Sequence, residues 1–505
     1  MMSPKCSFSE ALADPEQLSI TWELVPGRGM REKAQEHLLK MAELAAKDPK
    51  INAITITDNP GGKAAILPYS MAVEAKRLGI DPLVHFTSKD KNRNALESEL
   101  YALGRADIHN LLVMTGDYPT EGYAGLAKPV FDFDAVHALR MITKMNEGAY
   151  TNLPATHFFA GAVVSPFKAT EAETMAQYYK LHKKIANGAR FIITQLGFDA
   201  RKFDELRKYA DSNQFNVPLI GNIYVLSVPV AKLMNKNLIP GCVVTDKLVK
   251  KLEAEQADAA NKKEQQLLRA AKLYAVLKGL RYDGVNIGGH GLSYADVQYI
   301  MEKGEEQSGN WQDIAVADFD YPQADGFYFF EKDVTTGLNT CQPFDRRQTG
   351  SGHSSLKQSV MDLVHGVAFD HKAPLYPLNK AVAKFIDNSC LKKPFTIAEY
   401  TTKTMTNECR FCGDCAMHEL GFICPMSQCP KQQRNGACGG SRDGWCEVYP
   451  EQQKCIYVKM YEGFKGGGKE ERMKAKYMPP CNWELHRTSS WLNYFNDRDY
   501  NNNKG

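Results

Sequence analysis

The first 300 or so residues repeat one pattern, in which a short apolar or β-branched run is followed by an amphipathic stretch with helical spacing. Gly79, Gly104 and Gly188 lie just before the next apolar run, where a helix commonly ends in the left-handed conformation. Strands that alternate with helices predict a parallel sheet. The eight apolar runs lie at 19–26, 51–58, 82–88, 109–117, 155–164, 190–199, 217–226 and 283–289.

Eight strand–helix units in this length match a closed (β/α)8 barrel, the TIM barrel, in both number and span. The alternative is an open doubly wound sheet, but no G-x-G-x-x-G motif follows the first run. Periodicity is lost after about residue 304. We therefore expect an α/β fold: a barrel over 1–304, a connecting region over 305–395 that begins a second domain, and a smaller Cys-rich α+β metal-binding domain over 396–505. The highly charged stretch 246–272 is expected to form one long exposed helix on the barrel rim.

The charge balance and the terminal sequence exclude several classes of function. The 505 residues carry 62 Lys and Arg against 59 Asp and Glu, so the chain lacks the basic surplus of a nucleic-acid-binding protein. The N-terminal segment has no apolar core of a secretory signal, and no run approaches the roughly 18 apolar residues of a membrane span. We expect a cytoplasmic protein that binds neither nucleic acid nor membrane.

In a (β/α)8 barrel the chemistry lies at the C-terminal ends of the strands. There the sequence places acids at Glu23 and Asp117, an imidazole at His85 and an amide at Gln195. Glu23 follows Trp22, and desolvation beside this aromatic would raise the pKa of the carboxyl group and let it donate a proton near neutral pH. The alternative for Glu23 is an ion pair with a Lys or Arg at the barrel mouth. Other polar strand-end residues would cap the following helices: Thr57, Ser88 and Asn286.

Three segments, taken in order along the chain, resemble the catalytic barrel of methylenetetrahydrofolate reductases. They are TWELVPGRG at 21–29, HFTSKDKNRNALESELYALGRADIHNLLVMTGDYP at 85–119 and FIITQLGFD at 191–199. The resemblance covers roughly residues 15–304. It implies a flavoenzyme, fed by NAD(P)H or another reduced carrier, that reduces 5,10-methylenetetrahydrofolate to 5-methyltetrahydrofolate. FAD is the implied flavin, with FMN as the alternative.

The same resemblance implies roles for individual residues. Glu23 matches the family's acid, which helps to protonate the folate and open its imidazolidine ring. Asp117 matches the acid near the flavin and the pterin, and Gln195 matches the amide that orients the folate. Lys184 matches a lysine on the phosphate or ribose side of the flavin, although a solvated helix charge explains it equally well. The positions that match flavin contacts are Thr57, His85, Thr115, Gly116, Asp117 and Ala162.

The chain departs from the family pattern at three places. Ser88 replaces a common cysteine, Leu196-Gly197 replaces an aromatic pair, and the seventh strand, IYVLSVPV, has no clean match to an aromatic that packs on nicotinamide or folate. The last departure puts direct use of NAD(P)H in doubt. Two rival functions are a non-catalytic electron-transfer or scaffold subunit of a one-carbon complex, and a flavin reductase of another pterin.

Nine of the thirteen cysteines fall in the last hundred or so residues. In a chain without an export signal, this density indicates metal or redox chemistry rather than disulfides. CRFCGDC gives C-x-x-C-x-x-C spacing, and Cys424 and Cys429 each precede a proline, as the last cysteine of a bacterial ferredoxin run does. We predict an iron–sulfur cluster of the 4Fe–4S type, with zinc as the alternative. The predicted ligands are Cys409, Cys412, Cys415, Cys424, Cys429, Cys438, Cys446 and Cys455.

The tail also resembles the C-terminal domain of some methylenetetrahydrofolate reductases, which is found elsewhere as a separate iron–sulfur partner subunit. CGDC, CPMSQCPK and NGACGGSRDGWCEVYP carry this resemblance. It implies electron entry or structural metal binding beside the flavin, with an electron-carrier protein as a candidate partner. Cys481 lies beyond the motif and is left out of the ligand set. By analogy with barrel relatives, we expect a homo-oligomer.

Overall fold

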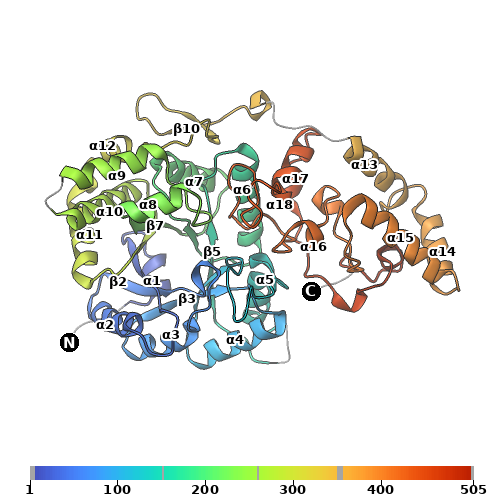
Figure 1. Ribbon diagram of the computed structural model, residues 1–505, viewed down its shortest axis with the longest axis horizontal. Helices are drawn as coiled ribbons and strands as arrows, with labels where there is room; N and C mark the ends of the chain where they lie inside the picture. The colour runs from blue at the N-terminus through green and yellow to red at the C-terminus, as the bar shows by residue number, and fades with distance from the viewer. Residues whose placement is uncertain (1–5, 150–152, 259–260, 350–355, 502–505) are drawn as a thin grey trace.

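A closed barrel of eight parallel strands forms the N-terminal part of the protein (Figure 1). The computed structural model describes residues 6–149, 153–258, 261–349 and 356–501. Each strand pairs with its sequence neighbours, and β1 closes the ring on β8. The (β/α)8 prediction is therefore confirmed. The strands are β1 Ser19–Leu24, β2 Ile51–Ile56, β3 Asp81–Thr87, β4 Asn110–Met114, β5 Phe159–Val164, β6 Ile192–Thr194, β7 Leu219–Val225 and β8 Gly284–Gly289.

Helices surround the barrel. The prediction of one long exposed helix over 246–272 is wrong. That stretch contains two helices, of which α10 is largely buried because it packs on β7, α11 and α12. The helices of this part are α2 Lys33–Lys47, α3 Pro68–Arg77, α4 Arg93–Arg105, α5 Ala135–Asn146, α6 Glu171–Ala186, α7 Ala200–Ser212, α8 Val228–Asn235, α9 Asp246–Asp258, α10 Lys262–Gly279, α11 Tyr294–Gln307 and α12 Trp311–Asp318.

The inside of the barrel changes from apolar to polar along its axis. At the N-terminal ends of the strands, helix α1 (Phe8–Ala13) inserts Phe8 and Leu12 among apolar strand residues and closes the barrel. Phe8 is fully buried and meets Phe159 and Phe191 edge to face. Towards the other end, inward residues hydrogen-bond across the lumen, which leaves the chemistry of the barrel at its mouth. These polar residues include Thr21, Glu23, Thr55, Asn222 and Asn286.

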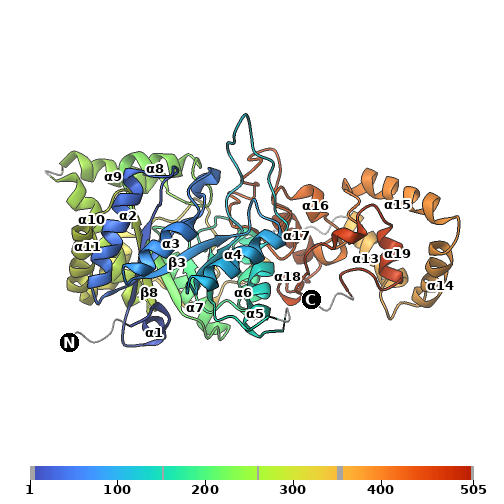
Figure 2. The same cartoon turned by 90° about the horizontal axis from the view of Figure 1, so that it is seen from below.

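The barrel unit continues past residue 304, because α11 crosses this position and α12 packs on α10. A hairpin of β9 (Phe330–Lys332) and β10 (Asn339–Pro343) follows and contacts α7. The last part is helical with irregular loops rather than α+β: over residues 356–501 the only β-pairing consists of isolated bridges around Trp445 (Figure 2). Its helices are α13 Leu356–Ala368, α14 Tyr376–Asp387, α15 Lys392–Asn407, α16 Pro425–Gln428, α17 Ile456–Lys465, α18 Arg472–Ala475 and α19 Ser490–Phe495.

The C-terminal part docks on α5 and α6, where α17 and α18 pack against α6 (Figure 1). Asp134, the N-cap of α5, accepts hydrogen bonds from the backbone N–H groups of Arg434 and Asn435 at 3.2 and 2.9 Å. Nearly all of α6 is buried, Lys180 and Lys183 included, because the docked part covers the face that would otherwise meet water. In the described part of the chain, no helix combines the length and apolarity needed to cross a bilayer.

Candidate active site and cysteine pockets

Glu23 lies near the C-terminal end of β1 and faces the barrel lumen. The side-chain amide of Asn286 on β8 donates to Glu23 Oε2 at 3.5 Å. Gly288 lies beside it, and a β-carbon at that glycine would come within 3.3 Å of Glu23 Oε1. Desolvation raises the pKa of Glu23, and the hydrogen bond from Asn286 opposes part of that rise. Among the described residues no Lys or Arg pairs with Glu23, so the ion-pair alternative is not supported and the proton-donor interpretation is kept.

Asn286 forms the centre of the polar network inside the barrel. Its Oδ1 accepts hydrogen bonds from Thr21 Oγ1 at 2.8 Å and from Thr55 Oγ1 at 3.3 Å. Its Nδ2 also donates to Asn222 Oδ1 at 3.4 Å. Two hydroxyl donors on one side fix the amide so that its NH2 group points to Glu23 and Asn222.

The helix-cap role expected of Thr57, Ser88 and Asn286 is wrong. Helix α4 is capped by Asn92 and α11 by Ser293, several residues farther along the chain. Helix α3 likewise begins well beyond Thr57. The longer loops leave the side chains of the strand ends at the mouth of the barrel.

Three buried polar atoms at the ends of β2 and β3 have no hydrogen-bond partner among the described residues: Thr57 Oγ1, His85 Nε2 and Ser88 Oγ. Burial lowers the pKa of His85 to about 4 against the opposing effect of the Asp58 carboxylate, so the ring is neutral at pH 7. Buried polar atoms normally find partners. Two hydroxyls and a neutral imidazole therefore fit the polar groups of a flavin, the cofactor that the resemblance implies.

Asp117 and Gln195 lie at the same mouth, next to the loop between α8 and α9. The carboxylate of Asp117 is exposed and accepts a backbone hydrogen bond from the β2–α3 loop at 2.7 Å. Gln195 lies under Gly241, where a β-carbon would be 3.2 Å from Gln195 Nε2. Burial raises the pKa of Cys242, in this loop, to about 12, and the carboxylates of Asp117 and Glu23 add to this rise. Glu23, Asp117 and Gln195 thus lie at the C-terminal ends of β1, β4 and β6, which open onto the same mouth of the barrel.

Two of the predicted flavin positions contact the C-terminal part instead of an open mouth. Thr115 Oγ1 donates to Gln433 Oε1 at 3.0 Å, and Lys431 Nζ donates to the carbonyl oxygen of Gly116 at 2.8 Å. Gly116 has a φ of 89°, and a β-carbon there would lie 2.7 Å from the Lys89 side chain. Only glycine therefore fits position 116, because the backbone there has a positive φ and the Lys89 side chain leaves no room for a β-carbon.

Ala162 and Lys184 lie in the wall between β5 and α6. Ala162 is fully buried among residues of the helix-facing core. Lys184 is also buried and donates to the carbonyl oxygen of Val163, and burial lowers the pKa of its ammonium group to about 7. The interpretation of Lys184 as a solvated charge is wrong, and its contact with a flavin stays a prediction.

Comparisons with known proteins decide the family. The family model described as methylenetetrahydrofolate reductase matches residues 8–278, more than half of the chain. The protein belongs to the methylenetetrahydrofolate reductase family. A second model, described as methylene-tetrahydrofolate reductase C terminal, matches residues 389–484. Both resemblances drawn from the sequence motifs are confirmed.

Individual relatives of this reductase-family chain are distant. Methylenetetrahydrofolate reductase 2 of Schizosaccharomyces pombe is 24% identical over 204 residues, which are 39% of this chain and 31% of that protein. A Clostridium thermocellum protein described as binding two copies of 5-methyl-5,6,7,8-tetrahydrofolic acid aligns with a TM-score of 0.41 and 13% identity, over 60% of this chain and 99% of that one. Yersinia pestis DHPS with a pterine–sulfa conjugate aligns with a TM-score of 0.33 and 12% identity, over 58% and 96%.

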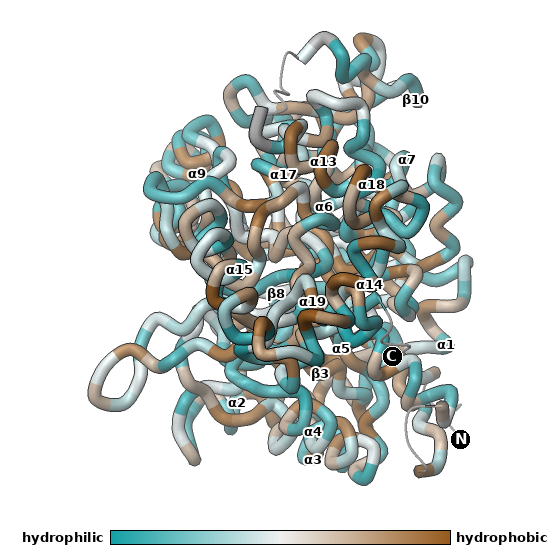
Figure 3. Tube along the Cα trace, turned by 90° about the vertical axis from the view of Figure 1, so that its right-hand side faces the viewer, coloured by the Kyte–Doolittle hydropathy of each residue, from teal (hydrophilic) through white to brown (hydrophobic). Residues whose placement is uncertain are grey.

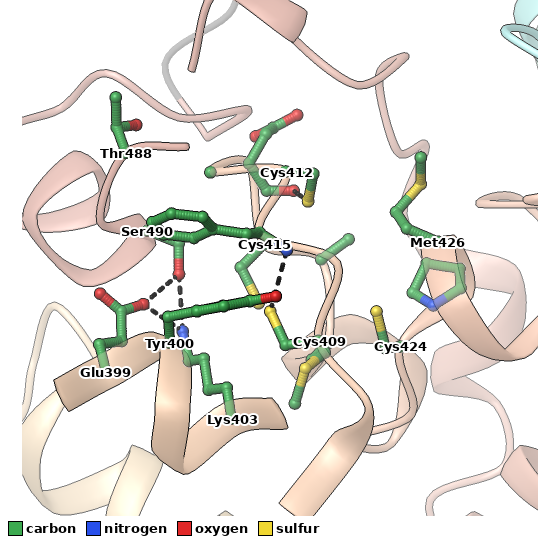
Figure 4. A pocket seen from close by; sticks show the side chains of 16 residues that line it. Glu399, Tyr400, Lys403, Cys409, Cys412, Cys415, Cys424, Met426, Thr488 and Ser490 are labelled. Carbon is green, nitrogen blue, oxygen red and sulfur yellow. Dashed lines mark hydrogen bonds and ion pairs between the residues drawn. The ribbon is translucent and has the colours of Figure 1, made fainter. Parts of the chain in front are cut away.

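The eight predicted cysteine ligands of the reductase-family chain divide into two sets of four. The first set, here called the outer set, lines one pocket beside α15 (Figure 4). Tyr400 and Lys403 of α15 line it too, and Lys403 Nζ pairs with Glu399 Oε1 at 2.6 Å. The outer set consists of Cys409, Cys412, Cys415 and Cys424.

The second set, here called the inner set, lines a separate pocket next to the barrel mouth. Lys431 and Glu447 line this pocket and pair at 2.5 Å between Nζ and Oε1. Because Lys431 also donates to Gly116, the inner pocket is joined directly to the end of β4. The inner set consists of Cys429, Cys438, Cys446 and Cys455.

Four thiols around one pocket match the ligand set of a 4Fe–4S cluster. Over the described residues, no three or more His, Cys, Asp or Glu side chains are arranged to hold a single metal ion. A zinc site would need its sulfur ligands within about 2.3 Å of one point. Each pocket therefore offers the four thiols that a cluster needs, and zinc stays the alternative.

Some residues of these sites were missed by reasoning from the sequence. The thiol of Cys481 is buried with the outer set and hydrogen-bonds with Cys412, although it lies far from the motif along the chain. Lys431 and Gln433 join the inner pocket to the barrel. Only the density of tail cysteines pointed to Cys481, and no local pattern marks Lys431 or Gln433.

Proposed function

We propose that the protein catalyses the flavin-dependent reduction of 5,10-methylenetetrahydrofolate to 5-methyltetrahydrofolate. The observation that carries this proposal is the desolvated carboxyl group of Glu23, whose pKa is raised at a mouth shared with Asp117 and Gln195. The family of the barrel supports the same reaction. A desolvated acid that faces no cation suits proton donation rather than a structural ion pair.

The residues of the mouth have separate tasks in this reaction. Glu23, held by Asn286, donates a proton to a nitrogen of the imidazolidine ring and so opens the ring of the bound folate. Asp117 and Gln195 orient the pterin by hydrogen bonds. Thr57, His85 and Ser88 would hold the flavin, which is FAD in this proposal, with FMN as the alternative. When bound, the flavin supplies the hydride that reduces the folate.

We further propose that each cysteine pocket holds a 4Fe–4S cluster. When bound, the clusters carry single electrons towards the flavin. The contacts of Lys431 and Gln433 with Gly116 and Thr115 support this role, because they place the inner pocket against the mouth. An electron-carrier protein is then the donor, and NAD(P)H is the alternative.

The test is an anaerobic absorption spectrum of the purified protein, with iron and sulfide analysis, before and after addition of 5-methyltetrahydrofolate. We expect the folate to bleach the flavin bands of the wild type. In Glu23→Gln, bleaching by folate should slow at least about 100-fold, while dithionite still reduces the flavin. Glu16→Gln, which changes an exposed carboxylate outside the barrel mouth, is the control and should behave as the wild type.

Other outcomes contradict defined parts of the proposal. A protein without flavin, or with a flavin that ignores folate, would favour the electron-transfer or scaffold subunit. Bleaching by a different reduced pterin alone would favour a reductase of that pterin. Flavin chemistry with zinc in place of iron would keep the enzyme and make the C-terminal part structural.

A further inference from the structure

The outer surface of α14 and α15 carries several large apolar side chains that meet solvent. On α14, Leu378, Val382 and Phe385 recur at helical spacing and are exposed, Phe385 by 67%. On α15, Ile397 and Met405 are exposed, Met405 by 83%. The opposite side of α14 already packs on α19, and both helices lie at the end of the molecule away from the barrel (Figures 1 and 2). We call these five residues the α14–α15 face.

Figure 3 views this end of the molecule directly, and hydrophobic residues recur along α13, α14 and α15 in it. A soluble monomer rarely exposes large apolar patches, and those it exposes usually mark interaction sites. The question is which partner such a face would take.

The α14–α15 face borders the outer cysteine pocket. Tyr400 and Lys403 lie on the same helix as Ile397 and Met405 and line that pocket (Figure 4). Tyr400 stacks on Phe411 with the ring centroids 4.4 Å apart, and it is still 36% exposed. On this side, therefore, the partly exposed ring of Tyr400 lies between solvent and the pocket of the outer set.

Unpaired charge around the face is mostly positive. Lys384, Lys393 and Arg410 are exposed and form no ion pair with the described residues. Asp387, by contrast, is neutralised by Lys392 at 3.1 Å and by a second cation, Arg498. Since Glu408 is the only exposed acid of residues 371–410 without such a pair, the surroundings of the face carry a surplus of positive charge.

We propose that the α14–α15 face is the docking surface for a small acidic electron-transfer protein, which delivers electrons to the outer set of cysteines. The inference rests on the proposed function, since it assumes clusters in the pockets. An apolar centre ringed by free cations matches an acidic partner, and electrostatic complementarity raises the rate of encounter more than the affinity. Electron-transfer complexes are typically small and weak, which fits a face made by two helices.

A second copy of the chain is a poorer occupant of the same face. A twofold contact is isologous, so it would place the same patch on both sides of the interface. Lys384, Lys393 and Arg410 of one copy would then face the same cations of the other. Like-charge contacts of this kind disfavour association.

The experiment uses the full chain, purified anaerobically with its clusters, and a reduced acidic two-cluster ferredoxin of the bacterial type as the probe. Stopped-flow absorbance gives the second-order rate constant for cluster reduction, and calorimetry gives binding of the ferredoxin independently of electron transfer. The variant is Lys384→Glu/Lys393→Glu/Arg410→Glu. The control is Lys33→Glu/Lys40→Glu/Lys236→Glu, which makes the same change of net charge on exposed lysines of the barrel part.

We expect the charge reversal to lower the rate constant at least about tenfold at low ionic strength, with a smaller effect at high salt. Reduction by methyl viologen, which needs no docking surface, should be unchanged in both variants. Phe385→Ser should weaken ferredoxin binding without altering the iron content.

Equal rate constants and equal binding for the reversed variant and the control would overturn the proposal. It would also be overturned if the wild type formed a dimer in sedimentation that Phe385→Ser dissolved, because the occupant would then be a second copy. A wild type without iron would instead contradict the proposed function. Binding by calorimetry would still decide whether the face takes the acidic carrier.

Discussion

At the barrel mouth, one side-chain hydrogen bond ties Glu23 to β8. Asn286 is the only described side chain that donates to the Glu23 carboxylate, and its own orientation is fixed by Thr21 and Thr55. Desolvation raises the pKa of this carboxyl group, and the hydrogen bond from Asn286 reduces the size of that rise. In the proposed reaction, the acid that would open the folate ring thus has its pKa set in part by Asn286.

Asn286→Ala should move the pH dependence of folate reduction. Removal of the donor leaves the desolvation unopposed, so the pKa of Glu23 rises further and the acid stays protonated to higher pH. The rate falls as the pH rises through the pKa of this acid. We therefore expect the alkaline limb of the pH–rate profile to shift upwards by about one unit, since hydrogen bonds to charged groups contribute about 1.5–3 kcal/mol.

The matched control is Thr21→Val, which removes a hydroxyl donor to Asn286 but keeps the donor to Glu23. It should lower the rate without moving the alkaline limb. A profile for Asn286→Ala that is lower at every pH but unshifted would reduce Asn286 to a purely structural role.

At the level of elements, the irregular loops of the tail gather the thiols into two pockets. Phe411 and Gly413 have positive φ, which turns the chain between the cysteines of CRFCGDC. Gly413 is required there, because a β-carbon would collide with the carbonyl oxygen of Leu485. Cys424 and Cys455 are the N-caps of α16 and α17. Burial raises the pKa of both thiols, and hydrogen bonds from the first turn of each helix oppose part of that rise.

Substitutions in one set of cysteines should remove one cluster and leave the other. We expect Cys412→Ser/Cys415→Ser and Cys438→Ser/Cys446→Ser each to lose about half of the iron and labile sulfide, with different changes in the electron paramagnetic resonance spectrum of the reduced protein. Cys6→Ser/Cys390→Ser, which alters exposed thiols outside both pockets, is the control. Loss of all iron from either double variant would show a single shared site.

Across the whole molecule, buried polar groups join the C-terminal part to the barrel. Asp134 is buried and accepts hydrogen bonds from Arg434 and Asn435 of the C-terminal part. Burial alone would raise the pKa of Asp134, but His137, Lys180 and the backbone donors outweigh it and hold the pKa well below its usual value. The docked arrangement therefore stabilises the charged form of this carboxylate.

Asp134→Asn should reduce the acid sensitivity of the protein. A depressed carboxyl pKa contributes stability that is present above the unfolded pKa of about 3.9 and is lost as the pH falls below it. We expect the variant to lose about 2 kcal/mol at pH 7, where the wild type keeps hydrogen bonds to a charged acceptor, and to lose less than the wild type between pH 7 and pH 3. Urea unfolding monitored at several pH values measures both differences.

Glu331→Gln, which changes an exposed carboxylate on β9, serves as the control and should follow the wild type at every pH. If Asp134→Asn and the wild type lost stability in parallel on acidification, Asp134 would not be the carboxylate that couples docking to pH.

At each scale, the sequence predicted the features that depend on residues close together in the chain better than those that depend on distant residues. The alternation of apolar runs with helical stretches predicted the closed barrel, because this pattern repeats within each short strand–helix unit of the sequence. Family motifs also placed Glu23, Asp117 and Gln195, which the structure brings to one mouth. The boundary near 304, the α+β character of the tail and the single helix over 246–272 were not reproduced, because packing between distant elements decides them.

The sequence by itself determined the barrel, the family and the thiol-rich chemistry of the tail, since each follows from residue types at short spacing. Only the tertiary structure decided that eight cysteines divide into two sets and that the inner set meets the end of β4. It also decided that Asn286 holds Glu23 and that Cys481 packs beside the outer set and contacts Cys412. These contacts join residues far apart in the chain. The spacing of neighbouring residues in the sequence does not indicate which distant surfaces pack against each other.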